Sequence, residues 1–263
     1  MKKKTVSIML AATMALSLFA GCGSSKDTAT EDTGKTESTE TTDESSENAS
    51  AETTDESSRT TFTVGFDAEY PPYGYMDDDG EYTGFDLELA QAVCDKEGWE
   101  LVKKPINWDS KDMELNSGSI DCIWNGFTMN GREDEYTFSV PYVDNSQVIV
   151  VAENSGIEQL SDLAGKTVGV QAASAALDLL QSEDEGGQKA LADTFGSLNE
   201  FADYNTAFTE LQAGALDALA IDVGVAKYQL NSRGEGFKIL DETLNTEQYA
   251  ICLLYTSPSP RDS

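Results

Sequence analysis

The chain has 263 residues and a formal net charge of -31 at neutral pH, with four cysteines and no histidine. The acidic balance, much of which lies before residue 60, argues against nucleic-acid binding, which needs a surface of clustered Lys and Arg. The lack of histidine removes the commonest general base and the commonest transition-metal ligand, and no cysteine pair has zinc-site spacing. No metal or other cofactor is therefore expected.

Residues 1–22 have the order of a secretion signal that ends in an acylated cysteine. Three lysines at residues 2–4 precede a mostly apolar run over residues 6–20, which is too short to span a bilayer comfortably, and Gly21-Cys22 follows. Small residues before a cysteine form the cleavage and acylation pattern of a bacterial lipoprotein, so Cys22 is the expected lipidation site. This predicts lipid anchoring to the extracytoplasmic face of the cell membrane. A plain signal peptide is the alternative.

Residues 23–60 are rich in Ser, Thr, Glu and Asp and contain no aromatic or branched aliphatic residue. Such a segment cannot bury enough apolar surface to offset its conformational entropy, which predicts a disordered acidic linker. A solvated spacer is favoured over an acidic partner-binding tail.

The cysteines other than Cys22 do not form a disulfide pattern. Cys94, Cys122 and Cys252 are an odd number, widely spaced, in apolar surroundings. Buried thiols are expected at these positions.

The remaining residues alternate short strand-like runs with helical stretches, which indicates α/β architecture. The first cycle predicts strands at 62–66, 101–105, 120–124 and 147–151, with helices at about 86–97 and 111–117. The second cycle predicts strands at 166–170 and 217–221, with helices at 174–181, 206–213 and 223–230.

One pattern, Leu-x-x-Gly-x-x-Asp, occurs at residues 115–121 in the first cycle and at residues 211–217 in the second. In each copy the glycine fits a helix stop, and the apolar run after it fits a buried strand. The strands then end in polar residues, Asn125 with Thr128 in the first copy and Asp222 in the second. Because ligands of open α/β sheets bind beyond the carboxyl ends of strands, two related lobes with a cleft between these strand ends are expected.

Six segments, in order and with their spacing, resemble the bacterial extracellular solute-binding family three, the polar amino acid binding proteins of ABC importers. They are GFDAEYPPYGY (65–75), YTGFDLELAQAV (82–93), NWDSKDMELNSGSIDCIWNGFT (107–128), FSVPYVDNSQVIVV (138–151), LSDLAGKTVGVQAASAA (160–176) and AFTELQAGALDALAIDVGVA (207–226). The resemblance implies a two-lobed type II periplasmic-binding-protein fold, in which each lobe is a mainly parallel sheet flanked by helices. The expected boundaries are 61–146 for the first lobe, 147–246 for the second and 247–253 for a return to the first.

The resemblance also implies a site for a free amino acid, which presents one carboxylate and one ammonium group. Arg132 is the expected carboxylate clamp, supported by Thr128 and by backbone amides near Gly126, because a planar guanidinium suits bidentate recognition. A surface ion pair with Glu133 or Asp134 is the alternative for Arg132.

Asp222 is the expected partner of the ligand's ammonium group, since a carboxylate at an open strand end can accept hydrogen bonds from a cation. A helix N-cap is its alternative role. Ser174 opens a helix and is expected to offer its hydroxyl and nearby amides to the ligand carboxylate, with a simple N-cap as the alternative.

Asp67, Tyr70 and Trp108 are expected to surround the ligand's side chain, because the family places an acid and stacking groups there. Core packing is the alternative for the two aromatic residues. Asp67 with Glu69 points to a cationic or strongly polar ligand, and Asn125 is a further hydrogen-bonding candidate.

The predicted function is capture of an amino acid, possibly cystine, for delivery to the permease of an ABC importer, by a monomer without catalytic activity. One alternative is an enzyme on the same fold, such as a cyclohexadienyl dehydratase, for which Glu69 is the available acid. Another is the ligand-sensing domain of a signalling protein.

Residues 254–263 do not continue the family pattern. They are rich in Pro and Ser, and Pro258 with Pro260 excludes a core helix. The stretch resembles peptide read from sequencing-adapter sequence, so the natural protein is expected to be longer and the first lobe to be incomplete here.

Overall fold

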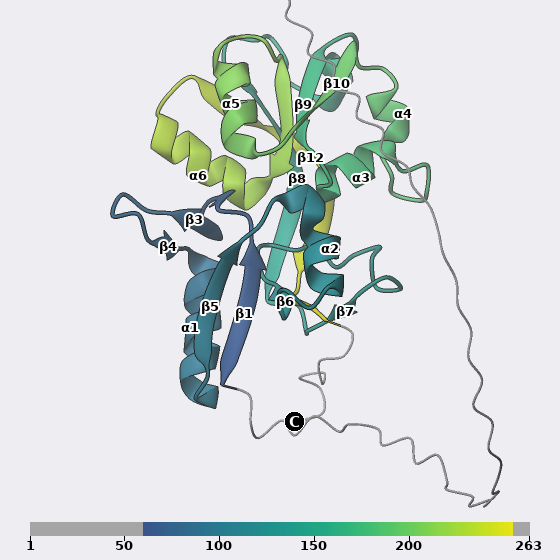
Figure 1. Ribbon diagram of the computed structural model, residues 1–263. Helices are drawn as coiled ribbons and strands as arrows, with labels where there is room; N and C mark the ends of the chain where they lie inside the picture. Colours follow the sequence, from purple (N-terminus) through teal and green to yellow (C-terminus); the bar gives the residue numbers. More distant parts are fainter. Residues whose placement is uncertain (1–59, 255–263) are drawn as a thin grey trace, which may run out of the picture. The chain divides into compact units, whose positions relative to one another are not determined.

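The computed structural model of the protein describes residues 60–254. The expected signal peptide, the lipidation site Cys22 and nearly all of the linker and the C-terminal tail lie outside the described residues. Within them the chain forms two five-stranded sheets and a smaller three-stranded sheet (Figure 1). In this part of the chain no helix combines the length and the apolar character needed to cross a membrane.

The first sheet has the strand order β5-β1-β6-β13-β7. Its strands are β1 (Thr61–Phe66), β5 (Glu100–Pro105), β6 (Cys122–Ile123), β7 (Thr137–Phe138) and β13 (Cys252–Leu253). β1 pairs in parallel with β5 and β6, and β13 is antiparallel to both β6 and β7. Only β13 therefore runs against the other strands, as expected for a mainly parallel lobe.

Two helices and a small sheet accompany the first sheet. The helices are α1 (Phe85–Glu97) and α2 (Lys111–Asn116). The small sheet consists of β2 (Glu69–Tyr70), β3 (Gly74–Met76) and β4 (Tyr82–Thr83). Phe62, Val64 and Phe66 alternate along β1 and pack in one cluster with Leu87 and Ala90 of α1. Alternation along a strand and i, i+3 spacing along a helix thus build this core.

The second sheet has the strand order β10-β9-β11-β8-β12. Its strands are β8 (Val143–Ala152), β9 (Thr167–Gln171), β10 (Ser197–Phe201), β11 (Ala218–Asp222) and β12 (Phe237–Tyr249). The flanking helices are α3 (Ala175–Gln181), α4 (Lys189–Ala192), α5 (Tyr204–Gln212) and α6 (Val223–Arg233). β9 is parallel to β10 and β11, and β8 is antiparallel to β11 and β12, so β8 alone is reversed in this sheet.

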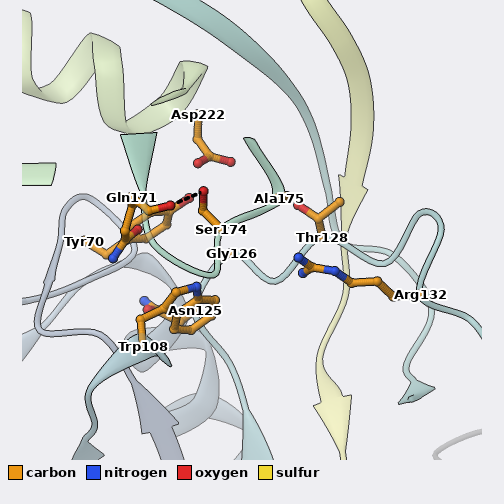
Figure 2. Close-up of a pocket in the computed structure, with 10 residues that line it drawn as sticks. All are labelled: Tyr70, Trp108, Asn125, Gly126, Thr128, Arg132, Gln171, Ser174, Ala175 and Asp222. Carbon is orange, nitrogen blue, oxygen red and sulfur yellow. Dashed lines mark hydrogen bonds between the residues drawn. The ribbon is translucent and has the colours of Figure 1, made fainter. Parts of the chain in front are cut away.

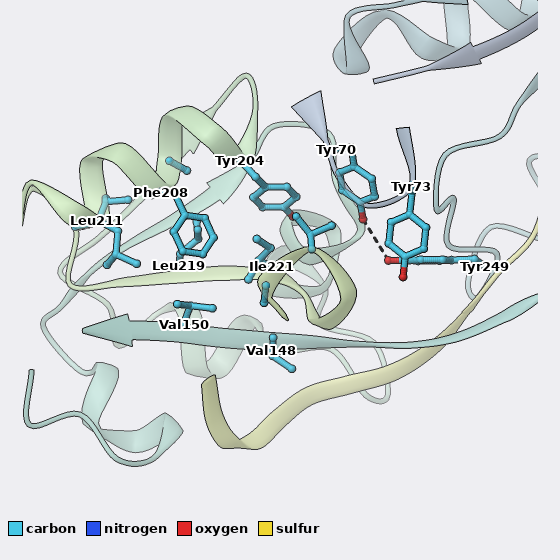
Figure 3. Close-up of a cluster of buried hydrophobic side chains, with 14 residues drawn as sticks. Tyr70, Tyr73, Val148, Val150, Tyr204, Phe208, Leu211, Leu219, Ile221 and Tyr249 are labelled. Atoms are coloured by element: carbon cyan, nitrogen blue, oxygen red, sulfur yellow. Dashed lines mark hydrogen bonds between the residues drawn. The ribbon is translucent and has the colours of Figure 1, made fainter. Parts of the chain in front are cut away.

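Both faces of the second sheet are buried, α5 and α6 covering one and α3 and α4 the other (Figure 1). Val148 and Val150 of β8 join the cluster that contains α5, whereas Ile149 and Val151 join the cluster that contains α3. Successive side chains of a strand point to opposite faces, so continuous apolar runs in β8 and β11 fit a strand buried on both sides. Figure 3 shows the first cluster, which continues from Phe208 to three tyrosines, Tyr70, Tyr73 and Tyr249.

The repeated pattern forms the same structure in both sheets. Gly118 and Gly214 each have a positive φ, 71° and 74°, directly after α2 and α5, as a helix stop requires. The aspartate that closes each copy then accepts a backbone hydrogen bond from a strand of its sheet, β1 in the first sheet and β9 in the second. Asp121 Oδ2 accepts the backbone N–H of Thr63 over 2.6 Å, and Asp217 Oδ2 accepts that of Thr167 over 2.8 Å.

The same equivalence includes a Thr-Val-Gly triplet, at residues 63–65 in β1 and 167–169 in β9, which was not predicted from the sequence. A Cβ added to Gly65 would lie 2.5 Å from Ile120, and one added to Gly169 would lie 2.5 Å from Leu216. Both glycines therefore admit the large residue that precedes the aspartate of the pattern. The shared geometry supports the expectation of two related lobes.

The chain crosses between the two large sheets twice, between β7 and β8 and between β12 and β13. β8 and β12 pair up to the crossing point, with Thr246 opposite Ser146 and Tyr249 opposite Val143. An isolated bridge links Thr128 to Tyr249 at the same place. The two large sheets are thus connected through these paired segments.

The expected helices and most strands are confirmed to within about two residues at most of their ends. Cys94, Cys122 and Cys252 are buried thiols, as expected. The strands β10 and most of β12 were missed, because their sequences SLNEF and FKILDETLNTEQY are polar and only partly buried. The β12 register also shifts between Ile239 and Asn245, which obscures its period.

Candidate ligand-binding site

A small cavity lies at the strand ends of the two large sheets. It is lined by Tyr70, Trp108, Asn125, Gly126, Thr128, Arg132, Gln171, Ser174, Ala175 and Asp222. Eight of the nine binding residues expected from the sequence are thus brought together, and Figure 2 shows Asp222 and Arg132 on different sides of the group. The cavity measures about 20 Å³, which holds a water molecule but no amino acid, so a ligand must enter by displacing these walls.

Asp222 ends β11 and is 4 % exposed. Asp222 occupies the N-cap position of α6, but its carboxylate makes no capping hydrogen bond. Instead Oδ1 accepts hydrogen bonds from Asn145 Nδ2 and Gln147 Nε2, both over 2.7 Å, and from the Tyr249 hydroxyl over 2.6 Å. Oδ2 has one long contact, 3.4 Å from the Tyr204 hydroxyl. The carboxylate is therefore held in place through one oxygen.

Glu247 of β12 lies in the same polar group and was not expected from the sequence. Its Oε1 accepts hydrogen bonds from Thr128 Oγ1 over 2.8 Å, from Asn145 Nδ2 over 2.7 Å and from Gln147 Nε2 over 2.8 Å. Burial, followed by the charge of Asp222, raises the pKa of Glu247. Asn145, Gln147 and Glu247 stand on the paired strands β8 and β12, so only the pairing register brings them to the site.

The Thr128 hydroxyl has one hydrogen, and Glu247 takes it. Thr128 can therefore offer only lone pairs to a ligand, which suits an ammonium group better than a carboxylate. This differs from the carboxylate role expected for this side chain.

Arg132 lies beside the cavity with its guanidinium 4.9 Å from the centre of the Phe127 ring. Its ion pair is with Asp178 of α3 over 2.5 Å. The expected alternative was wrong, since among residues 60–254 Arg132 forms no ion pair with Glu133 or Asp134. A guanidinium has five N–H donors, so the pair with Asp178 leaves donors for a second carboxylate.

Ser174 caps α3, as the alternative for this residue stated. Its Oγ accepts the backbone N–H of Leu177 over 3.2 Å and donates to the Gln171 carbonyl over 2.7 Å. The hydroxyl hydrogen is thus committed within the chain (Figure 2).

Gly126 lines the cavity through its missing side chain. Its φ is 59°, and an added Cβ would lie 3.0 Å from the rings of Tyr249 and Tyr70. Its backbone N–H donates to Asp86 Oδ2 over 2.6 Å, so this particular amide is not available to a ligand carboxylate as expected. The amide Nδ2 of the neighbouring Asn125 is buried without a partner in the described chain and remains a donor for a ligand.

Asp67 is the expected residue that the small cavity does not include. It lines a second cavity of about 550 Å³ that shares Trp108 with the first. Gln171 Nε2 donates to Asp67 Oδ2 over 2.7 Å, joining the two sheets. Burial raises the pKa of Asp67 to about 6. Gln171 was missed, although it ends a strand in the same way as Asp222 and the same pattern would have found it.

The second cavity is strongly acidic. Its wall includes five carboxylates, those of Asp67, Glu69, Asp109, Glu114 and Asp203. Lys111 lies close by but is 5 % exposed, and its Nζ donates to the Ala173 carbonyl over 3.1 Å. Burial lowers the pKa of Lys111.

Tyr70 and Trp108 combine both roles that the sequence left open. Tyr70 belongs to the apolar cluster of Figure 3 and also lines the small cavity. Trp108 packs beside Phe127, with ring centres 5.8 Å apart, and separates the two cavities.

Two α/β sheets joined by paired strands, with a polar cavity at their strand ends, define a solute-binding protein of the periplasmic-binding-protein class. The chain belongs to the bacterial extracellular solute-binding proteins, family 3, whose model matches residues 62–229.

Relatives of known specificity agree with this assignment. The chain is 29% identical to the L-cystine-binding protein TcyJ of Escherichia coli over 198 residues, covering 74% of this chain and 71% of that protein. It is 32% identical to the arginine-binding extracellular protein ArtP of Bacillus subtilis, covering 68% of each. A solved ABC uptake transporter substrate binding protein from Streptococcus pneumoniae with bound histidine has a TM-score of 0.69, 35% identity and coverage of 73% and 79%. These relatives favour solute binding over the enzymatic alternative.

Proposed function

We propose that the chain captures a free amino acid between its two lobes and delivers it to the permease of an ABC importer. Asp222 receives the ammonium group and Arg132 receives the carboxylate. The observation that carries the proposal is that a buried carboxylate, not used as a helix cap, and a guanidinium with unused donors line one cavity. An amino acid presents the complementary pair of charges on one carbon, and charge-assisted hydrogen bonds to both give selectivity.

The remaining expected residues have supporting roles. The Thr128 hydroxyl accepts from the ammonium group, Asn125 Nδ2 donates to the ligand, and Ser174 with Gly126 shapes the wall. The ligand's side chain passes Tyr70 and Trp108 toward Asp67.

The second cavity supports an extended, cationic or strongly polar side chain. Its volume of about 550 Å³ and its five carboxylates favour a guanidinium, an imidazolium or the second ammonium group of cystine over an apolar side chain. The named ligands of the relatives, cystine, arginine and histidine, all meet this description.

Closure accompanies binding in this proposal. The lobes, 61–146 with 247–253 and 147–246, rotate about the paired segments near Ser146 and Thr246, and the closed form is what the permease recognises. The chain acts as a monomer. Cys22, which lies outside the described residues, carries the lipid that holds the protein at the extracytoplasmic face of the cell membrane.

Binding is tested by a thermal-shift screen of the twenty amino acids and cystine, followed by calorimetric titration of the hits. Asp222→Ala and Arg132→Ala should each abolish measurable binding while the chain stays folded. Asp241→Ala, an exposed aspartate on β12, is the matched control and should bind as the wild type does. Unchanged affinity in both site variants would refute the site.

Lipid anchoring is tested separately. A bacterial host expressing the chain is fed an alkyne-tagged palmitate, and the tag should label the wild type but not Cys22→Ala. A label that persists in the variant would contradict acylation at this cysteine.

A further inference from the structure

Asp222 and Glu247 share the same two amide donors. Asn145 Nδ2 lies 2.7 Å from both Asp222 Oδ1 and Glu247 Oε1, and Gln147 Nε2 lies 2.7 Å and 2.8 Å from them. Because both oxygens lie 2.7 Å from the same nitrogen, Asp222 Oδ1 and Glu247 Oε1 are separated by at most twice that distance. An amide nitrogen carries two hydrogens, so both amides have used all their donors on this pair.

No cation of residues 60–254 balances the pair. Asp222 and Glu247 are each 4 % exposed, and neither takes part in an ion pair within the described chain. The titratable groups around Glu247 are acidic or neutral: Asp222 from β11, Tyr249 from β12, Tyr204 from α5, and Tyr70 from β2 behind Tyr249. Arg132 lines the same cavity, but its ion pair is with Asp178. Two like charges this close in a buried site do not both ionise readily.

The group also has more acceptors than donors. The amide oxygens of Asn145 and Gln147 are buried and have no hydrogen-bond partner in the described chain. Asn145 is 4 % exposed and Gln147 is fully buried. Buried polar atoms are normally satisfied, so this cluster is short of hydrogens as well as of positive charge.

We propose that Glu247, beside the carboxylate of Asp222, holds a proton until the ammonium group of the ligand replaces it. The proton leaves to the solvent, and the ammonium group supplies one positive charge and three N–H donors in its place. Before binding the pair carries one negative charge, and after binding it carries two, balanced by one from the ligand. Glu247 is thus a positioning residue: it accepts the hydrogen of the Thr128 hydroxyl, which fixes that hydroxyl as an acceptor, and it gives up the proton when the ligand binds. This inference rests on the proposed function, since it requires an ammonium ligand at Asp222.

Binding that releases a proton strengthens as the pH rises. The affinity should increase by up to about tenfold for each pH unit over the range in which Glu247 titrates, and flatten above it. Burial raises the pKa of Glu247, which places this range above that of an ordinary glutamate. Asp67 also lines the route of the ligand, with a pKa raised by burial to about 6, so its proton must be distinguished from that of Glu247.

The test is calorimetric titration of the chain with L-arginine, L-histidine, L-glutamine and L-cystine, in buffers of low and high ionisation enthalpy. The difference in apparent enthalpy gives the number of protons released for each ligand bound. We expect a release that approaches one in the wild type, that is lost in Glu247→Gln, and that persists in Glu235→Gln, an exposed glutamate used as the matched control. Binding without buffer dependence, or release that survives in Glu247→Gln but disappears in Asp67→Asn, would overturn the proposal.

A second measurement needs no ligand, and so separates this inference from the proposed function. The infrared difference spectrum between wild type and Glu247→Gln, both ligand-free at neutral pH, should contain the carbonyl band of a protonated carboxyl group. Failure of all twenty amino acids and of cystine to bind would refute the proposed function alone. Absence of that band, in variants shown by circular dichroism to be folded, would refute a protonated Glu247.

Discussion

The guanidinium of Arg132 lies 2.5 Å from the carboxylate of Asp178, and this ion pair joins the loop after β6 to helix α3 of the second sheet. The Arg132 side chain is 13 % exposed, whereas that of Asp178 is 61 % exposed. Asp178 therefore pairs, from the solvent side, with the Arg132 guanidinium that we propose as the binding group for the ligand carboxylate. It competes with the ligand for the same cation.

Asp178→Asn should consequently strengthen ligand binding. The substitution removes the competing charge and keeps the shape, and an exposed ion pair is worth up to about 1 kcal/mol, so we expect affinity to rise about two- to fivefold. Calorimetric titration measures it, with Glu183→Gln, an exposed residue of the following loop, as the control. Weaker binding in Asp178→Asn would show instead that Asp178 orients Arg132 for the ligand.

Gly126→Ala should destabilise the chain. The backbone at Gly126 has φ 59°, and the new Cβ would lie 3.0 Å from the rings of Tyr249 and Tyr70. We expect the free energy of unfolding to fall by about 1–3 kcal/mol from backbone strain, with a further loss from displacement of the rings. Gly131→Ala is the matched control for strain, because Gly131 has φ 79° with no atom within 4 Å of its added Cβ. Equal losses in urea denaturation would mean that the rings move aside freely.

Asp67→Asn should flatten the pH dependence of stability. Burial raises the pKa of Asp67 from 3.8 to about 6, so the folded protein binds this proton more tightly than the unfolded chain. The free energy of unfolding then falls as the pH rises through that interval, by up to about 3 kcal/mol for a shift of about two units. Urea denaturation across the interval should show a smaller fall in the variant. The fall that remains is assigned to Asp86, whose pKa burial raises to about 7, and to Glu247, whose pKa burial also raises. Identical profiles for both proteins would contradict the prediction.

Asp203→Asn should weaken cationic ligands selectively. Asp203 lines the second cavity and caps α5 through Oδ1, which accepts the Thr206 N–H over 2.7 Å. Asn caps a helix as well as Asp does, so the variant removes a charge without opening the helix. We expect affinity for L-arginine to fall severalfold and affinity for L-glutamine to stay constant. An equal loss for both ligands would show that the cavity does not select by charge.

Much of the fold could be predicted from the periodicity of apolar residues and the positions of glycines. β1, β9 and β11 are short apolar runs bounded by turn residues, and α1 has clear ends, so local sequence was sufficient for them. β12 was different, because it is stabilised by pairing with β8 along its length rather than by an apolar run of its own. Pairing between segments about ninety residues apart leaves no local signal.

The candidate site could likewise be predicted only in part from the sequence. Asn125, Thr128 and Asp222 follow predicted strands, and a rule about strand ends was enough to place them in one cavity. Glu247 and Asn145 reach the site only through the β8 and β12 register, which spacing in the sequence cannot give. The role of the Thr128 hydroxyl as an acceptor could not be predicted from the sequence either. It depends on which neighbour accepts the single hydrogen of this hydroxyl, and in the structure that neighbour is Glu247.

The polar group around Asp222 is built where the two chain crossings run side by side. Glu247 and Asn145 face each other in the β8 and β12 ladder, and the Thr128 bridge to Tyr249 ties the first sheet to the same point. A rotation about these strands displaces atoms in proportion to their distance from the axis, so groups on the axis hardly move. The polar group proposed to bind the ammonium group would then keep its arrangement while the lobes are apart. Arg132 would move into place when the lobes close. Under the proposed function, an incoming amino acid would first be bound through its ammonium group, and its carboxylate would contact Arg132 only once the lobes close.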